Sequence, residues 1–315
     1  MGGVAVAAIV ASALAIALGA APAGASVTLG ETFDPTQDFG GAGVFIQSGS
    51  PDNKYMVPFD GVLTRWSFQS ASVDTPPLKM KIMRRLSGDD FLTVADTQLE
   101  APVPSTLNTW PTRLSVKAGD LLAHVYTDTT FGFNSGVGIS AEFVTNEISG
   151  APGNPALDPP PGTTTTFDSD SSSQQIDLSA VLENDADQDG FGDESQDKCV
   201  GTPGPYNGCP NTVEIDKLKQ KGETKVKATA TVPGAGTLAV GSASDKALAS
   251  AKSLKVAERT LTGTAKQQVK LTLKLTKSAI SRLADSGKLK LKVKAVYTPV
   301  GGPAGSDVAK KKLKA

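Results

Sequence analysis

The chain has 315 residues, a formal net charge of −1, 5% aromatic residues, one histidine and two cysteines. So few His and Cys side chains exclude a conventional structural zinc site, which needs four such ligands. The near-neutral total conceals a partition: residues 26–150 carry a net charge of −6, residues 151–212 of −10 and residues 213–315 of +15. The charge is therefore arranged as a strong dipole along the chain.

Residues 1–25 are small and apolar, and they end in Ala23-Gly24-Ala25. An apolar run followed by an A-x-A site is typical of a secretory signal peptide. A membrane anchor is the alternative, but it needs about 20 continuous apolar residues, and Gly19 and Pro22 interrupt the run. No later segment is apolar enough to span a bilayer. We therefore expect a secreted protein, extracellular or at the cell surface, without a transmembrane segment.

Residues 26–150 contain short runs of strand composition separated by turns rich in Gly, Pro, Asp and Ser. Leu78, Met80 and Ile82 alternate with lysines, which is the period of a half-buried strand. Helical periodicity is missing. The pattern predicts an all-β, jelly-roll-like β-sandwich. The expected strands are residues 44–47, 54–57, 62–69, 78–84, 91–95, 113–116, 121–126 and 137–144.

The same residues give little support for catalysis. His124 shares a strand face with Leu122 and Tyr126, which favours a packed histidine. This part of the chain has neither a G-x-S-x-G motif nor a cysteine, so we expect no enzyme. A carbohydrate-binding module or carbohydrate-active enzyme is the alternative and requires exposed aromatic side chains. Trp66 and Trp110 each fall on the same strand face as apolar or β-branched neighbours, which favours a position in the core.

Residues 151–182 are rich in Pro, Thr and Ser and are predicted to form a linker. Within them, residues 176–182 are apolar enough either to close the first sandwich as a last strand or to lead into the next segment.

Residues 183–210 hold both cysteines and the densest carboxylates of the chain. Asp185, Asp187 and Asp189 occupy positions one, three and five of a loop. Gly190, at position six, permits a sharp turn, and Phe191, at position seven, offers a backbone carbonyl. Oxygen ligands in this spacing are those of a calcium loop. An acidic linker with a chance DxDxDG run is the alternative.

The loop differs from an EF-hand, because Gln196 stands at position twelve and a Gly- and Pro-rich turn follows instead of a helix. A DxDxDGxxD run leading into D-x-C resembles a thrombospondin type 3 repeat, here a single copy over residues 183–210. The resemblance implies that Ca²⁺ is bound by Asp185, Asp187, Asp189, the carbonyl of Phe191 and, directly or through water, Asp193. Asp197 is our candidate for the closing carboxylate.

Cys199 and Cys209 are the only cysteines of a chain expected to be exported. In an oxidising compartment, two such neighbouring cysteines are expected to form a disulfide bond.

Residues 211–315 are predicted to form a basic, immunoglobulin-like β domain with strands at 225–232, 237–240, 251–256, 268–275 and 288–297. A short helix is expected between Thr276, a plausible N-cap, and Gly287. Lysines alternate with apolar residues on two of the strands. They form either an ordinary solvated face or a contact surface for an anionic cell-wall or extracellular glycan. Nucleic acid is not expected, because no aromatic residues are interleaved.

The overall layout resembles the modular secreted proteins of actinobacteria. We therefore expect a secreted, calcium-binding, non-catalytic protein with a structural or adhesive role at the cell surface or in the matrix.

Overall fold

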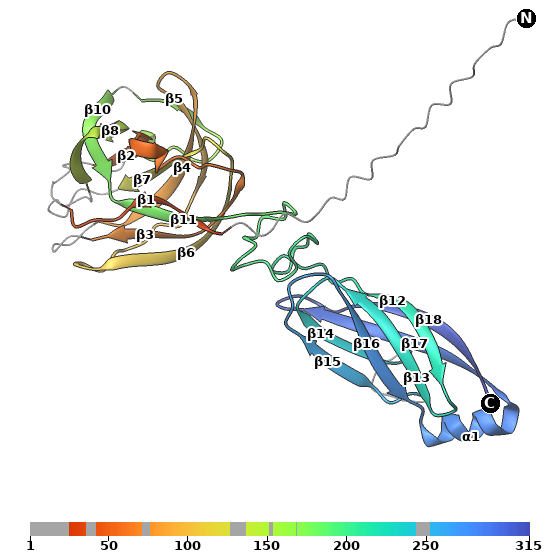
Figure 1. Ribbon diagram of the computed structural model, residues 1–315. Coiled ribbons are helices and arrows are strands. Elements are labelled where there is room, and N and C mark those ends of the chain that lie inside the picture. The colour runs from red at the N-terminus through yellow and green to blue at the C-terminus, as the bar shows by residue number, and fades with distance from the viewer. Residues whose placement is uncertain are drawn as a thin grey trace, which may run out of the picture.

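The computed structural model describes residues 25–35, 42–70, 76–126, 137–150, 154–167, 169–243 and 253–315. The predicted signal peptide lies, except for Ala25, outside the described residues. The fold is all-β, as expected: four antiparallel sheets form two sandwiches, and one short α-helix accompanies the second. Figure 1 shows the two sandwiches on either side of an irregular segment that contains the predicted calcium loop.

The first sandwich contains eleven strands and two 3-10 turns in the described residues. They are β1 (Val27–Glu31), β2 (Ala42–Gly49), η1 (Pro51–Asn53), β3 (Gly61–Gln69), β4 (Leu78–Ser87), β5 (Asp90–Asp96), β6 (Leu107–Val116), β7 (Leu121–Tyr126), β8 (Val137–Gly150), η2 (Pro155–Leu157), β9 (Thr164–Thr166), β10 (Ser169–Ile176) and β11 (Leu178–Glu183).

One sheet has the order β1-β11-β3-β6, and the other has the order β10-β8-β2-β7-β4-β5-β9. Strands β1 to β7 and β11 follow the jelly-roll order, with β1-β11-β3-β6 facing β2-β7-β4-β5. Strands β8 and β10 extend one edge of the second sheet, and β9 extends the other.

The core between the two sheets is large and aromatic, and Trp66, Phe45, Tyr126 and Leu182 are among its buried members. A second apolar cluster covers the outer side of the seven-stranded sheet and includes Phe167. All six residues of β7 are buried, because both of its faces are covered. This double burial explains why residues 121–126 are nearly continuously apolar.

The predicted linker, residues 151–182, is instead largely part of this sandwich. It contains η2, β9, β10 and most of β11. Strand β11 lies between β1 and β3, and Leu178, Ala180 and Leu182 are buried in the core. The last-strand alternative for residues 176–182 is therefore confirmed by the pairing of β11. Residues 54–57, predicted as a strand, form a tight turn after η1 with only an isolated bridge at Met56.

The second sandwich has a three-stranded sheet, β12-β13-β16, and a four-stranded sheet, β15-β14-β17-β18. This order agrees with an immunoglobulin-like sandwich whose fourth strand pairs beside the third instead of on the opposite sheet. The elements are β12 (Glu214–Lys221), β13 (Lys225–Val232), β14 (Gly236–Ser242), β15 (Ala257–Leu261), β16 (Gln267–Lys274), α1 (Lys277–Ser286), β17 (Lys288–Pro299) and β18 (Gly305–Lys314).

Helix α1 begins and ends where the sequence predicts. The Thr276 side chain caps it by accepting a hydrogen bond from the N–H of Ala279, and Gly287 ends it in the left-handed conformation. The strand predicted at 251–256 is wrong in position, because β15 begins at Ala257 and Leu254 makes only an isolated bridge.

Asp177, next to β11, gives the first sandwich a pH-dependent stability. The residue is fully buried, and one carboxylate oxygen has no hydrogen-bond partner among the described residues. Burial raises the pKa of Asp177 to about 8, although the N–H groups of Phe33 and Gln69 oppose the shift. In the unfolded chain the pKa returns to about 3.9. The folded state therefore loses stability as the pH rises from about 4 to about 8.

We expect Asp177→Asn to match the wild type near pH 4 and to be clearly more stable at pH 8 to 9, because asparagine carries no charge to bury. Urea unfolding of both proteins across this range measures the difference. A stability difference that does not change with pH would contradict this account of Asp177.

Candidate metal centre

The segment that follows β11 is fastened to the first sandwich by Glu183, the last residue of that strand. The Glu183 side chain is buried. One of its oxygens accepts hydrogen bonds from the N–H groups of Glu194 and Ser195, at 3.0 and 2.9 Å. The other accepts from the hydroxyls of Thr64 on β3 and Ser195, at 2.8 and 2.7 Å. These bonds lower the pKa of Glu183 against the opposing effect of burial. Both oxygens of this carboxylate thus already accept hydrogen bonds from the protein itself.

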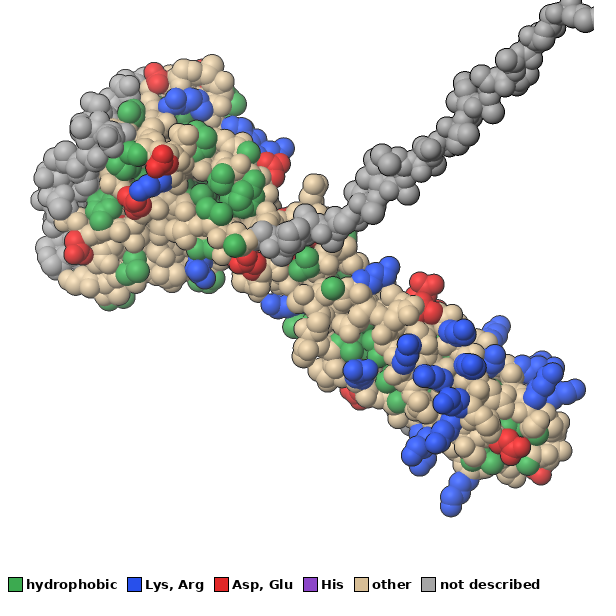
Figure 2. All heavy atoms as spheres, in the orientation of Figure 1, with side chains coloured by type: hydrophobic (Ala, Val, Ile, Leu, Met, Phe, Trp, Pro, Cys, Tyr) green, Lys and Arg blue, Asp and Glu red, His purple; other side chains and the backbone are tan. Residues whose placement is uncertain are grey.

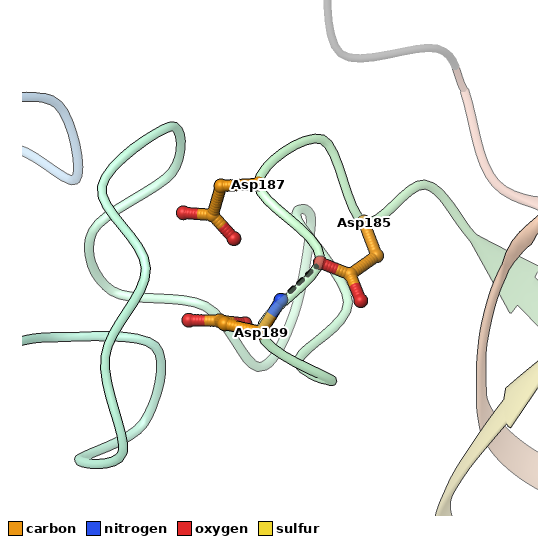
Figure 3. Close-up of side chains that lie close together, drawn as sticks. All are labelled: Asp185, Asp187 and Asp189. Atoms are coloured by element: carbon orange, nitrogen blue, oxygen red, sulfur yellow. Dashed lines mark hydrogen bonds between the residues drawn. The ribbon is translucent and has the colours of Figure 1, made fainter.

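Asp185, Asp187 and Asp189 converge in the loop that comes next, as Figure 3 shows. Each offers a carboxylate oxygen, and these three atoms lie within 4.8 Å of one another. Asp185 shapes the turn by accepting hydrogen bonds from the N–H groups of Asp189 and Gly190, at 3.0 and 2.9 Å. Gly190 has φ of 84°, a conformation that favours glycine. The spacing of the aspartates and the glycine at position six therefore produce the predicted turn.

Four carboxylate oxygens in this segment are buried and lack a hydrogen bond: both of Asp187 and one each of Asp193 and Asp197. The other carboxylate oxygen of Asp193 accepts a hydrogen bond from the N–H of Ala186, at 3.2 Å, and that of Asp197 accepts one from the N–H of Cys199, at 2.6 Å. Carboxylate oxygens are only acceptors, and a buried acceptor without a donor is costly. The buried negative charge without hydrogen-bond donors is the electrostatic environment expected of a cation site.

The pKa values record the same crowding of negative charge. Burial raises the pKa of Asp187 to about 6, and the charges of Asp189, Asp185 and Asp193 add to the effect. Burial likewise raises the pKa of Asp197 to about 7, with contributions from Asp189, Asp187 and Asp193. The pKa of Asp193 is also raised, first by burial. Asp193 and Asp197 therefore lie near enough to the first three aspartates for their charges to raise both pKa values, although the oxygens that converge within 4.8 Å belong to Asp185, Asp187 and Asp189.

The disulfide bond between Cys199 and Cys209, predicted from the sequence, is present in the structure. It closes the turn that carries Gly208, which has φ of 78°. A Cβ atom at Gly208 would lie 1.8 Å from Oδ1 of Asp197. Only glycine therefore fits beside this carboxylate, and the disulfide-closed turn determines where Asp197 lies.

Three side chains that were not predicted to hold the loop in place do so. Glu183 bonds the segment to Thr64, as described above. The guanidinium of Arg113 on β6 lies 4.1 Å from the centre of the Phe191 ring. The amide of Gln196 donates a hydrogen bond of 2.7 Å to the carbonyl of Thr112. Gln196, at the position of the EF-hand glutamate, thus contacts β6. No local pattern identifies these partners, because they are distant in sequence.

The far end of the segment is fastened to the second sandwich. The carbonyl of Lys198 accepts from the N–H of Ala235, at 3.1 Å. The sulfur of Cys199 lies 4.0 Å from the hydroxyl of Tyr297 on β17. The amide of Asn207 donates to the carbonyl of Val300, at 3.2 Å. The acidic cluster therefore lies in a segment bonded to both sandwiches.

The other predicted functional residues lie in the first sandwich. His124 is fully buried against Phe45 and Tyr126, and burial lowers its pKa to about 3. Trp66 is 1% exposed and stacks on Trp110, with ring centres 4.4 Å apart. The packed position expected for His124 and Trp66 is thus confirmed, whereas Trp110 is only partly buried and packs against the margin of the core.

No family model, curated protein or solved structure matches this chain. None of the helices in the described part of the chain has the length and apolarity to cross a bilayer.

Proposed function

We propose that this is a secreted, non-catalytic modular protein in which a calcium-binding joint holds two β-sandwiches together, with a structural or adhesive role at the cell surface or in the matrix. The observation that carries the proposal is the group of four buried, donorless carboxylate oxygens on Asp187, Asp193 and Asp197. Asp187 converges with Asp185 and Asp189, and the charges of these aspartates contribute to the raised pKa values of Asp193 and Asp197.

The donor set fits calcium. Ca²⁺ takes six to eight oxygen ligands, including carboxylates and backbone carbonyls, and tolerates irregular geometry. Asp185, Asp187, Asp189, Asp193 and Asp197 supply carboxylates, and the carbonyl of Phe191 is a further ligand in this proposal. An ion here would neutralise part of the repulsion among five acidic side chains.

The position of the cluster gives the ion its proposed role. Glu183, before the cluster, is bonded to β3, and Gln196, just before Asp197, is bonded to β6 of the first sandwich. Cys199 and Asn207, after the cluster, contact β17 and the turn after it. Without a cation, repulsion among the aspartates weakens the loop between these two anchors. With a cation, the loop and the disulfide would form a single rigid connection.

Export supports the choice of metal and compartment. The apolar leader ending in Ala23-Gly24-Ala25 and the disulfide bond are both typical of secreted proteins. Extracellular calcium modules bind at about 10⁻⁴–10⁻³ M, so such a site fills outside the cell. The buried His124, whose pKa is lowered to about 3, supports a structural role over catalysis.

The joint is tested by small-angle scattering and limited proteolysis of residues 26–315 in calcium, in chelator and in magnesium. We expect calcium alone to narrow the distribution of interdomain distances and to suppress cleavage near Asp189. Identical scattering and cleavage in calcium and chelator would refute the joint. Isothermal calorimetry on the same protein should give one site, and no heat of binding would refute the metal.

A further inference from the structure

Strands β17 and β18 carry six lysines on one exposed face, which we call the lysine ladder: Lys288, Lys290, Lys292, Lys310, Lys312 and Lys314. The strand register places them directly opposite one another in three pairs. These pairs are Lys288 with Lys314, Lys290 with Lys312, and Lys292 with Lys310. All six side chains are exposed, and Figure 2 shows the Lys and Arg side chains gathered over the second sandwich.

The ladder is unfavourable for folding. Like charges directly opposite each other on an antiparallel pair destabilise the sheet. None of the six lysines forms an ion pair with a carboxylate among the described residues. Asp307, the one acid on β18, lies at an inward-facing position of the strand and accepts a hydrogen bond from the N–H of Ile215.

Edge protection does not explain why the lysines of the ladder are paired. Lysines on an edge strand prevent pairing with other chains, and β18 is an edge of its sheet. Strand β17 pairs with β18 along the whole ladder but with β14 only from Val293 to Pro299, so its ladder lysines lie beyond the end of β14. Protection of an edge requires charged side chains but not lysines aligned opposite lysines, so the three opposed pairs require another reason.

A hollow of about 680 Å³ lies along the ladder. Four ladder lysines line it, Lys290, Lys292, Lys310 and Lys312, together with Lys311, and Arg282 of α1 contributes a sixth cation. Arg282 donates to the oxygens of Ser253 and Ser278, and among the described residues it has no carboxylate partner. The strands and the helix thus present a concave, strongly cationic surface.

We propose that the lysine ladder and Arg282 bind an extended, linear phosphodiester polymer built on polyol units. Successive pairs of the ladder are separated by two residues, which is about 6.8 Å along a strand. An anionic group that recurs about every 7 Å would meet one lysine pair at each repeat. Lysine is a flexible point charge that suits exposed phosphate oxygens.

Nucleic acid fits this surface less well. Binding of single strands depends on aromatic side chains that stack on bases. The exposed large hydrophobic residues of the described chain are all leucine or valine, so no aromatic platform accompanies the ladder. The proposed partner therefore has phosphates but no bases. This inference is independent of the calcium site.

The test uses residues 26–315 and poly(glycerol phosphate) as the probe, with titrations between 50 and 200 mM salt. The ladder variant replaces Lys290, Lys292, Lys310 and Lys312 by glutamine. The matched control replaces four exposed lysines of the other sheet by glutamine and therefore removes the same charge. Its positions are Lys219, Lys225, Lys270 and Lys274.

We expect the ladder variant to bind poly(glycerol phosphate) more than about tenfold more weakly than the wild type. The slope of log K against log salt concentration should become less steep by about 3, because each lost phosphate contact contributes roughly 0.7. The control should bind like the wild type. The ladder variant should also unfold at a higher temperature, because opposed like charges are removed. This measurement verifies that the variant is folded.

Three results would overturn the proposal. Equal loss in both variants would mean that only the total charge matters. Equally tight binding of hyaluronan, a carboxylate polymer without phosphate, would reject the phosphodiester. Tighter binding of a single-stranded oligonucleotide with the same number of phosphates would identify nucleic acid as the partner instead.

Discussion

Replacing Asp187 with asparagine is expected to stabilise the protein in chelator and to destabilise it in calcium. Without metal, both carboxylate oxygens of Asp187 are buried and three aspartates lie nearby, and only the backbone N–H of Thr202 offsets the resulting rise of its pKa. Removing its charge relieves both the burial cost and the repulsion. With metal, the same charge is a ligand, and its loss weakens binding.

The calcium effect in the wild type follows from mass action. At 10 mM calcium and a Kd of about 10⁻⁴–10⁻³ M, binding stabilises the folded state by about 1.4–2.7 kcal/mol. Asp187→Asn should lose most of this increment. Thermal unfolding of wild type and variant at pH 7.5, with calcium and with chelator, gives the four values needed.

Asp285→Asn, at an exposed position on α1, is the matched control and should leave the calcium increment unchanged. If Asp187→Asn stabilises the protein equally in calcium and in chelator, the aspartate cluster binds no metal. A variant that is less stable than the wild type in both conditions would contradict the repulsion argument itself.

Replacing Lys81 with methionine is expected to destabilise the first sandwich by about 3 kcal/mol, the lower end of the cost of breaking a buried ion pair. Lys81 on β4 is fully buried. Its ammonium lies 2.8 Å from Asp158 and 3.2 Å from Asp96, and it donates to the carbonyl of Pro159, at 2.7 Å. Lys79 contacts the same two carboxylates and limits the loss.

The same contacts hold residues 154–167 on the outer side of the seven-stranded sheet, where Phe167 joins an apolar cluster. We therefore expect the Lys81 variant to be cleaved faster in this stretch as well as to unfold at lower urea concentration. Lys54→Met removes a solvent-exposed pair with Glu31 and should change the stability far less than Lys81→Met. Equal effects of the two changes would contradict the structural role of Lys81.

Local patterns in the sequence determined the features that depend on neighbouring residues. Alternate aspartates followed by Gly190 converge in one loop because a short turn leaves them no room to separate. Thr276 and Gly287 bound a helix because their side-chain and backbone preferences satisfy its ends. The all-β class follows from strand composition with a period of two, and the disulfide follows from the presence of only two cysteines.

Features that depend on distant pairing were decided by the tertiary structure. Composition predicted a linker for residues 151–182, yet β11 fills a gap between β1 and β3, where its apolar face completes the core. Glu183 fastens the acidic segment because Thr64, 119 residues away, lies beside it. The alternation of lysines on β17 is visible in the sequence, but only the register with β18 places each of them opposite a lysine of β18. Register and strand order depend on how the faces of strands that are distant in the sequence pack together. A local hydrophobic period does not specify which other strand or face will be the partner.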